Sequence, residues 1–502
     1  MNSTTSPPAV PAPARPDDPL PLTPLISPFM SELLGERALL RSLVHGLGSP
    51  LNIVLPQQVT ENVTEFGAVL RDTGVSGTLY YAHKANRSAA LVRALAATDA
   101  RIDVASTGEL QRALGAGFAP GRIMATGPKS PEFLWLALRS GVTVNVDSIA
   151  ELDLVGDIAT RHGLGPVDVL VRLSGFTVSG TTVLSRPSRF GVPTERLGDV
   201  FAALDRLRTV VRLVGFAYHL DTITIGEKAR AFDACIRALR EARRHGHGPQ
   251  VVDIGGGFGV NYLADGSEWE AFTSALAEAT LGQRDPVTWQ GAGYGLRNES
   301  GRLRGSIGLY PAHRPTTGPA YLAELLATRA PTLGLPLGRA MLESMHEVWI
   351  EPGRALLDQC GLVLTRVLEV RPSGDGNSAF VRLDLNAGDV GLEEHGVHLD
   401  PVVIPADGSA NGPGSAYLIG NLCLEADFIS RRKIWFRSMP SVGDLLAFPN
   451  TAGYFMDFSA DHALDQPVAR KVALTREDTG WHWQLDDEHW PVRAPAADKE
   501  DK

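Results

Sequence analysis

Four short motifs place side chains that could do chemistry directly after runs of apolar residues. The first is Lys84, which follows Tyr80-Tyr81-Ala82 and His83. Partial burial at the end of an apolar strand would lower the lysine pKa and favour the neutral amine, which can form a Schiff base. A lysine in a solvated loop is the alternative, and it is the commoner setting for this residue type.

Three consecutive glycines, Gly255, Gly256 and Gly257, follow the apolar run that contains Asp253. Glycines allow backbone amides to approach an anion closely, as they do in phosphate-binding turns. The motif is not the dinucleotide fingerprint, because Val260 stands where G-x-G-x-x-G requires its last glycine. A tight structural turn is the alternative.

The other two motifs are Glu351-Pro352-Gly353-Arg354 and the single residue His219, each at the end of a further apolar run. A carboxylate beside a ring nitrogen keeps that nitrogen protonated, and an arginine binds phosphate in a forked geometry. A surface ion pair between Glu351 and Arg354 is the alternative. His219 could stack on an aromatic ring or be an ordinary core histidine.

Eight short apolar runs alternate with helical stretches rich in Ala, Leu and Arg, a pattern typical of parallel strands joined by crossover helices. Eight such units predict a closed (β/α)8 barrel of the TIM type, with an open doubly wound sheet as the alternative. Polar and glycine residues follow the runs, so they should gather at one end of the barrel. The expected strands are 78–82, 102–105, 122–125, 142–146, 167–171, 213–218, 250–254 and 347–350.

The pattern also predicts the domain organisation. A leader rich in Pro, Ser and Thr (1–30) is expected to be disordered, and residues 31–50 are expected to pack on a C-terminal domain. The barrel should span 51–350, with an insertion at about 281–318 that breaks the strand and helix rhythm. Short alternating strands from 351 to 490 predict an antiparallel β domain, followed by a flexible tail at 491–502.

Composition excludes several classes of protein. The 502 residues carry 47 Lys and Arg against 57 Asp and Glu, and this net charge of −10 does not favour nucleic acid or anionic lipid as a partner. The three cysteines are Cys235, Cys360 and Cys423, too few and too scattered for a disulfide framework or a four-cysteine zinc site. We therefore expect a reducing, cytoplasmic location, no bound metal and no membrane span.

Together the motifs resemble the ornithine/diaminopimelate decarboxylase family of fold type III pyridoxal-phosphate enzymes, whose barrel is of the alanine racemase type. The resemblance covers about residues 50–460 and includes, in order, 82–86, 103–110, 188–191, His219, 255–257 and 351–354. It implies that Lys84 is the Schiff-base lysine, that His219 stacks on the pyridine ring, and that Glu351 is the partner of the ring nitrogen. The implied phosphate ligands are Thr222, Gly255, Gly256, Gly257, Arg354 and Tyr454, the last within Thr451-Ala452-Gly453-Tyr454.

The resemblance also implies a homodimer with shared active sites. Cys423 lies in Gly420-Asn421-Leu422-Cys423, which is similar to the family motif whose thiol acts as proton donor in the neighbouring subunit. The acidic residue that usually follows this cysteine is replaced by Leu424, and no arginine follows Gly391 like the one that diaminopimelate enzymes use. The candidates for contact with the distal end of the substrate are Glu425, Asp427 and Asp389.

The resulting hypothesis is decarboxylation of an α-amino acid, or of a conjugated or carrier-linked amino acid admitted by the insertion. One alternative is an amino-acid racemase on the same scaffold, which would need a second base opposite Lys84. The other is a non-catalytic protein that binds pyridoxal phosphate. Proteins of that kind consist of the barrel alone, whereas this chain continues into a β domain.

Overall fold

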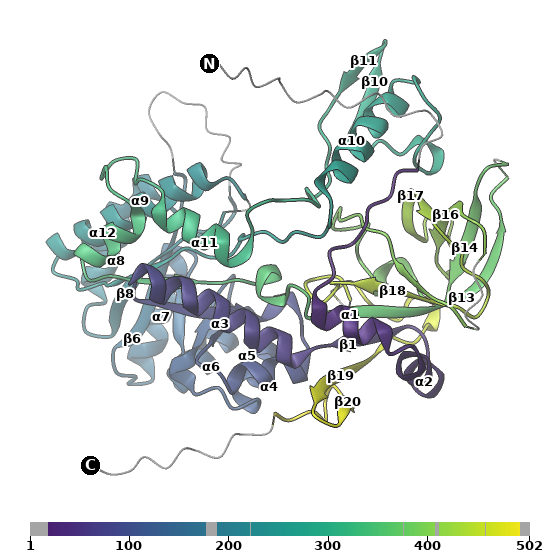
Figure 1. Cartoon of the computed structure of the whole chain (residues 1–502). Coiled ribbons are helices and arrows are strands. Elements are labelled where there is room, and N and C mark those ends of the chain that lie inside the picture. The colour runs from purple at the N-terminus through teal and green to yellow at the C-terminus, as the bar shows by residue number, and fades with distance from the viewer. Residues whose placement is uncertain are drawn as a thin grey trace, which may run out of the picture.

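Two bodies of different architecture make up the computed structural model, a helix-covered barrel and a β domain (Figure 1). The structure describes residues 19–176, 188–220, 222–374, 376–406, 411–456 and 458–491. The part of the expected leader before residue 19 and the expected tail after residue 491 lie outside these residues. Within the described ranges, no helix combines the length and the apolar character needed to span a membrane.

The barrel contains eight parallel strands, as the sequence predicts. They follow the order β5-β4-β3-β2-β12-β9-β8-β6, and pairing of β5 with β6 closes the ring, so the open-sheet alternative is wrong. The strands are β2 (Gly77–Ala82), β3 (Arg101–Val104), β4 (Ile123–Ala125), β5 (Thr143–Val146), β6 (Val167–Ser174), β8 (Val211–Ala217), β9 (Val251–Asp253) and β12 (Glu347–Ile350). The short strand β7 (Val192–Pro193) extends the sheet beside β6.

Side-chain caps start several of the barrel helices immediately after the strands. Ser88, Ser106, Ser130 and Ser148 each accept a hydrogen bond from a backbone N–H in the first turn of the next helix. These caps keep the loops at the carboxyl ends of the strands short. The helices are α3 (Pro56–Thr73), α4 (Ala89–Ala96), α5 (Thr107–Gly115), α6 (Pro131–Ser140), α7 (Ile149–Arg161), α8 (Leu197–Arg206), α9 (Ile225–Arg244), α11 (Gly318–Ala327) and α12 (Leu337–Glu343).

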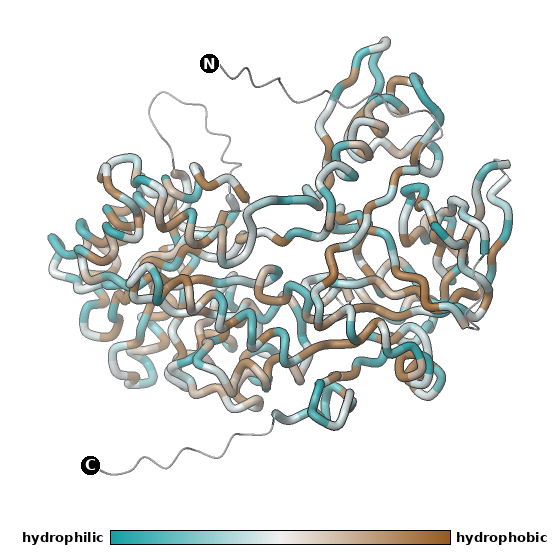
Figure 2. The backbone as a smooth tube through the Cα atoms, in the orientation of Figure 1, coloured by the Kyte–Doolittle hydropathy of each residue, from teal (hydrophilic) through white to brown (hydrophobic). Residues whose placement is uncertain are grey.

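Apolar packing holds the barrel from both sides. Tyr80, Met124, Leu170 and Trp349 form a cluster of buried side chains contributed by four different strands. The helices turn their apolar faces to the outside of the strands, and hydrophobic and hydrophilic residues alternate along them (Figure 2). The strand ends therefore sit on a filled, rigid scaffold.

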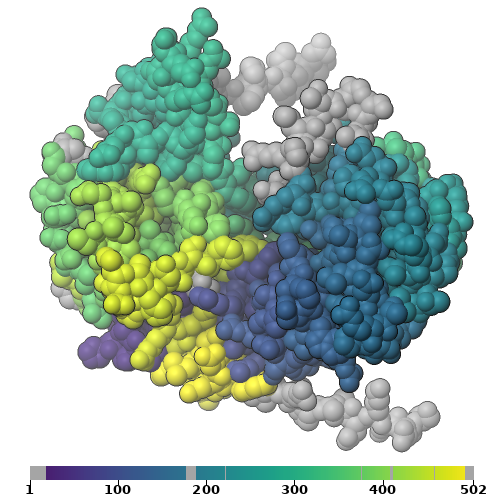
Figure 3. All heavy atoms as spheres, turned by 180° about the vertical axis from the view of Figure 1, so that it is seen from behind, coloured from purple at the N-terminus to yellow at the C-terminus, as the bar shows by residue number. Residues whose placement is uncertain are grey.

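The β domain begins earlier in the chain than expected. Strand β1 (Leu51–Val54) pairs antiparallel with β13 (Gly361–Pro372) and parallel with β19 (Arg470–Glu477), so residues 51–54 belong to this domain and not to the barrel. Figure 3 shows the result from behind, with C-terminal residues in yellow beside N-terminal residues in purple. The remaining strands, mostly antiparallel, are β14 (Ala379–Leu383), β15 (Val402–Ile404), β16 (Gly414–Ile419), β17 (Phe428–Phe436), β18 (Leu445–Pro449) and β20 (Gly480–Leu485).

The described end of the expected leader is ordered, which corrects the prediction for residues 19–30. Leu22 is fully buried, and its N–H donates to Asp400 Oδ2 at 2.9 Å. The N–H of Leu25 donates to the Tyr262 carbonyl at 2.8 Å, so this extended segment contacts both bodies. Helices α1 (Pro28–Gly35) and α2 (Arg37–Leu47) then pack their buried leucines on the β domain.

The insertion at 281–318 packs on the β domain. Trp289 stacks on Phe428 with ring centroids 5.6 Å apart, and it meets Phe380 and Tyr417 edge-on. The hairpin of β10 (Arg297–Glu299) and β11 (Arg302–Arg304) is exposed and projects beside α10 (Gly266–Thr280) in Figure 1. The insertion is thus anchored by an aromatic cluster, while its arginine-rich tip faces solvent.

Candidate active site

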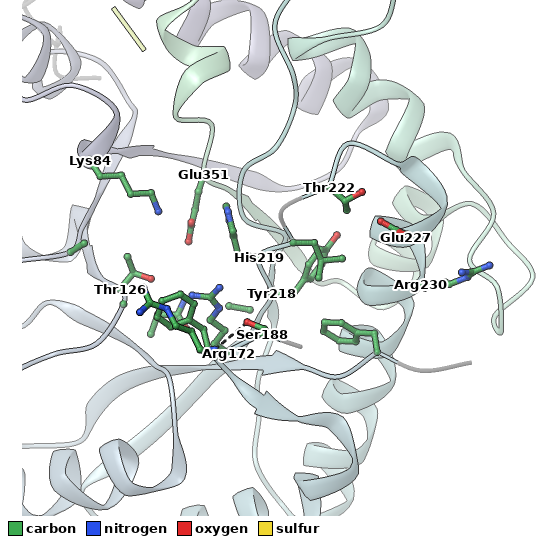
Figure 4. Close-up of a pocket in the computed structure, with 18 of the residues that line it drawn as sticks. Lys84, Thr126, Arg172, Ser188, Tyr218, His219, Thr222, Glu227, Arg230 and Glu351 are labelled. Carbon is green, nitrogen blue, oxygen red and sulfur yellow. Dashed lines mark hydrogen bonds between the residues drawn. The ribbon is translucent and has the colours of Figure 1, made fainter. Parts of the chain in front are cut away.

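A pocket of about 770 Å³ opens at the carboxyl ends of the barrel strands. Side chains from different strand ends converge on it: Lys84 after β2, Arg172 on β6, His219 after β8 and Glu351 after β12. Figure 4 shows Lys84 directed across the pocket toward Glu351 and His219, with Thr222 and Arg230 on the far side. The structure therefore brings the main predicted residues together.

Lys84 lies in the 3-10 turn η1 (His83–Ala85). Burial alone would lower its pKa, but the negative charges of Asp103 and Glu351 act against burial, and the pKa is raised. The expectation of a lowered lysine pKa is therefore wrong for the protein without ligand, because two carboxyl groups from other strands face the amine.

Glu351 lines the pocket and interacts electrostatically with two further buried carboxyl groups, those of Asp103 and Asp253. Asp103 and Asp253 are buried, and burial followed by the charge of Glu351 raises the pKa of each well above its ordinary value. Asp253 also accepts the N–H of Gly255 at 2.8 Å, which fixes the start of the glycine turn. Of these three carboxyl groups, Glu351 is the one that lines the pocket.

His219 and the glycine turn are in direct contact. The N–H of Gly256 donates to His219 Nδ1 at 3.3 Å, and burial followed by the charge of Lys84 lowers the His219 pKa well below its ordinary value. The ring is therefore neutral, with Nδ1 as acceptor. A neutral, fixed imidazole is suited to stacking on another ring.

The glycine turn cannot accept side chains. A Cβ on Gly255 would lie 2.7 Å from the Tyr218 carbonyl oxygen, and one on Gly256 would lie 2.8 Å from the Glu351 carbonyl oxygen. Gly255 and Gly257 also have φ values of 63° and 81°, in the left-handed region that favours glycine. The turn is thus built for close backbone approach.

Arg354 and Tyr454 lie together near this turn. The guanidinium of Arg354 donates to Tyr262 Oη at 3.1 Å and lies within about 5 Å of the ring centroids of Tyr454 and Phe455. Burial opposes the charge of Arg354, but hydroxyls around it, first that of Tyr262, outweigh burial and raise its pKa. Across the described part of the chain, no carboxylate lies within salt-bridge distance of Arg354. A half-buried cation of this kind suits an anionic ligand.

Thr222 lines the same pocket, with its Oγ1 accepting the N–H of Thr224 at 3.1 Å. Its hydroxyl proton stays available to a ligand oxygen. The predicted set of Thr222, the three glycines, Arg354 and Tyr454 thus offers hydroxyl, amide and guanidinium donors.

The predicted cysteine is on an exposed loop of the β domain. Cys423, Leu424 and Glu425 are exposed and do not line the pocket of their own chain. Asp427 is buried and accepts the N–H groups of Ala387 and Leu422, so its carboxylate shapes the loop. These two hydrogen bonds occupy the carboxylate oxygens of Asp427 that contact with a substrate would need.

Asp389, the third candidate for substrate contact, is buried beside this loop. One of its oxygens accepts the N–H of Asn386 at 2.9 Å, and burial raises its pKa to about 6. It does not line the pocket either.

Three site residues were given no role from the sequence. Asp103 interacts with the charge of Lys84. Arg172 Nη1 lies 3.7 Å from Asp147 Oδ1, and Lys228 is buried behind the glycine turn. Asp103 carries a sequence signal, because an acid inside an apolar strand needs a partner. Lys228 carries none, since a lysine in a helix usually faces solvent. Among the described residues, no group of three or more His, Cys, Asp or Glu side chains is arranged to hold a metal ion.

Comparison with known proteins agrees with this geometry. Residues 57–304 match the family model for the pyridoxal binding domain of pyridoxal-dependent decarboxylases. The chain is 30% identical to an uncharacterized protein, y4yA, of Sinorhizobium fredii over 443 residues, which cover 86% of this chain and 89% of that one. It is 23% identical to diaminopimelate decarboxylase of Staphylococcus aureus, with 86% and 90% covered.

A solved structure shares the fold. Diaminopimelate decarboxylase from M. jannaschii, in complex with L-lysine, superposes with a TM-score of 0.66 at 20% identity, covering 88% of this chain and 91% of that one. At this identity the likeness concerns the fold.

The residues in the pocket fit pyridoxal phosphate by their own chemistry. The glycine turn leaves no room for side chains, and Arg354 is a half-buried cation without a carboxylate partner among the described residues. A neutral imidazole, His219, lines the same pocket as Lys84 and Glu351. From its match and its relatives, the chain belongs to the fold type III family of pyridoxal-phosphate-dependent decarboxylases.

Proposed function

We propose that this protein removes CO2 from an α-amino acid or amino-acid conjugate, using pyridoxal phosphate attached at Lys84. The observation that carries the proposal is the convergence of Lys84, Glu351 and His219 on one pocket, with the glycine turn hydrogen-bonded to His219 and to the backbone of Glu351. They come from four separate strand ends, and their chemical types correspond to the amine, acid, stacking group and phosphate cradle that such a cofactor needs.

When bound, the cofactor supplies a protonated pyridine ring that accepts the electron pair left on the α carbon as CO2 departs. Glu351 holds the proton on the ring nitrogen, which keeps the ring electron-poor. His219 stays neutral and packs against the ring face, so it adds no positive charge that would compete with the nitrogen. Lys84 would provide the amine to which the cofactor attaches.

The α carbon then needs a proton, and we assign this step to Cys423 of the partner subunit. Cys423 is exposed on the loop between β16 and β17, outside its own pocket, so a second copy of the chain must bring it to the reacting carbon. The thiol gives its proton to the carbon, and water restores that proton after release of product. This assignment makes the homodimer the catalytic unit.

The same loop guides the proposal for the substrate. Leu424 is 57% exposed, and next to Cys423 it presents an apolar side chain to the neighbouring site. A charged ammonium at the distal end of a substrate would lose hydration there without gaining an anionic partner. We therefore propose a substrate with an apolar or conjugated distal end.

The test combines attachment with turnover. The purified protein is incubated with pyridoxal phosphate, reduced with borohydride and digested, and mass spectrometry then locates the modified lysine. We expect the label on Lys84 and its loss in Lys84→Ala. Lys433→Ala, on β17 in the β domain, is the matched lysine control and should keep the label.

Turnover is measured as CO2 release and as change of chirality over a panel of basic, acidic and apolar L- and D-amino acids and their N-acyl conjugates. CO2 release that depends on Lys84 supports decarboxylation. Chirality change without CO2 would instead identify a racemase. A label that persists in Lys84→Ala, or no label in the wild-type protein, contradicts the proposal.

A further inference from the structure

Lys228 is a fully buried lysine without an acidic partner. It lies in the first turn of α9, its exposed fraction is 0%, and no Asp or Glu of the described residues lies within salt-bridge distance. Buried lysines are almost always paired, because a lone charge in the interior loses its hydration. A cation near the N-terminus of a helix is also opposed by the helix dipole. Something other than a carboxylate must account for this position.

The ammonium group lies directly against the glycine turn. Lys228 Nζ donates a hydrogen bond to the Gly256 carbonyl oxygen. A Cβ placed on Gly257 would lie 2.9 Å from Nζ and 3.2 Å from the Thr222 carbonyl oxygen. The ammonium therefore lies beside Thr222, Gly256 and Gly257, three of the residues that are expected to hold the phosphate group.

The ammonium also retains unused hydrogen-bonding capacity. An ammonium has three N–H donors, and Gly256 is the one acceptor found for Lys228 among the described residues. The closest aromatic contact is with the face of Phe258, 5.4 Å from Nζ, which accommodates the positive charge without neutralising it. A ligand oxygen could therefore be accepted without breaking an ion pair.

The charge of this region points to a dianion. In the described part of the chain, the buried Lys228 and the half-buried Arg354 are both cations without a carboxylate partner, and Lys228 contacts the glycine turn directly. A phosphate monoester carries a charge near −2 at neutral pH. We propose that Lys228 is an additional ligand of the cofactor phosphate, acting with Arg354 to balance its two negative charges. The proposal rests on the proposed function, since it concerns the same pocket.

Without the cofactor, burial lowers the pKa of Lys228 to about 7, so much of the apoprotein carries a neutral amine at this position under mildly alkaline conditions. A phosphate group favours the charged form. Lys228 would thus act on phosphate affinity and contribute little to binding of the ring.

The experiment compares two ligands that differ in the phosphate. Pyridoxal phosphate and pyridoxal are titrated separately into the apoprotein, and dissociation constants are measured from the change in absorbance. Two variants remove the charge: Lys228→Met keeps the length of the side chain, and Lys228→Gln keeps an N–H donor for the Gly256 carbonyl. Lys129→Met is the matched control, because Lys129 is also buried but has Glu151 at 3.0 Å as its partner.

We expect both Lys228 variants to bind pyridoxal phosphate roughly 10- to 100-fold more weakly, the range for loss of one hydrogen bond to a charged group. The affinity for pyridoxal should change by less than about twofold, because pyridoxal has no phosphate group for Lys228 to contact. The apo form of Lys228→Met should unfold at a temperature no lower than wild type, since an unpaired buried charge has been removed. Lys129→Met should keep the wild-type ratio of the two affinities.

An unchanged ratio in Lys228→Met and Lys228→Gln overturns the role of Lys228 while leaving the function at Lys84 intact. If both ligands bind more weakly by the same factor, Lys228 supports the structure of the glycine turn and does not contact the phosphate, which also overturns the proposal. If the wild-type protein binds neither ligand, both this inference and the proposed function fail.

Discussion

At the scale of single residues, the pocket separates several acids by their surroundings. Asp103 and Asp253 are disposed to remain protonated, whereas Glu351 faces Lys84 across the pocket (Figure 4). Burial and repulsion between neighbouring carboxylates favour the protonated forms of Asp103 and Asp253, and Glu351 is the member of the group that lines the pocket where a ring nitrogen is expected. This gives Glu351 a specific electrostatic task.

Glu351→Gln should therefore affect turnover more than binding. The amide is similar in size but cannot hold a proton on the ring nitrogen. We expect kcat to fall by about 100-fold or more, in the range for removal of one preorganised electrostatic group. The affinity for pyridoxal phosphate, measured by absorbance, should change far less. A variant with wild-type kcat would show that Glu351 does not partner the ring.

At the scale of elements, the sequence predicts those strands and helices whose signals lie within a short stretch of the chain. The eight barrel strands are recognisable because each apolar run ends in turn-forming or polar residues, and Lys84, His219 and Glu351 follow from those ends. The position of β1 could not be predicted in this way, because the apolar run Leu51–Val54 would suit either sheet. The strands that it pairs with lie about 300 and 400 residues further along the chain. The ordered backbone around Leu22 also depends on a distant contact, the hydrogen bond from Leu22 to Asp400.

The insertion shows how such distant contacts assemble. His398 of the β domain is fully buried between Tyr294 of the insertion and Phe272 of α10, at centroid distances of 4.8 and 5.9 Å. Burial, followed by the charge of Arg432, lowers its pKa to about 3. The histidine is therefore an uncharged packing element.

The pH dependence of stability should report this burial. The folded pKa of His398 lies below the unfolded value of about 6.5, so its contribution is complete above pH 6.5 and is lost as the pH falls toward 3. Against His398→Phe, which cannot titrate, the wild type should lose about 1.4 kcal/mol per pH unit below 6.5, or roughly 2 kcal/mol by pH 5. Urea unfolding of both proteins at neutral pH and at pH 5 measures the difference. Parallel pH profiles would mean that His398 is hydrated.

At the scale of the whole molecule, the proposed active site draws residues from more than one chain. Lys84 lies in the barrel pocket and Cys423 on an exposed loop of the β domain, so the proposed reaction draws one residue from each subunit. In a symmetric dimer each subunit would give its cysteine loop to the other site, producing two equivalent sites.

Mixing two inactive variants should therefore restore activity. Lys84→Ala and Cys423→Ala are each expected to be nearly inactive, but a mixed dimer contains one site with both residues intact. After dissociation and reassociation at equal concentrations, about one quarter of wild-type activity should return, from the statistics of a symmetric dimer. CO2 release measures it, and mixing each variant with itself is the control. No recovery would place both residues in the same chain.

The placement of β1 also sets an order of events during synthesis. All eight barrel strands have left the ribosome once residue 350 has emerged, so the barrel can close while the β domain is still incomplete. Strand β1 lies between β13 and β19, and β19 begins only at Arg470. The strand made first must therefore wait, with one edge open, for the strand made nearly last. Translation that stops before residue 470 would leave that edge exposed to other chains.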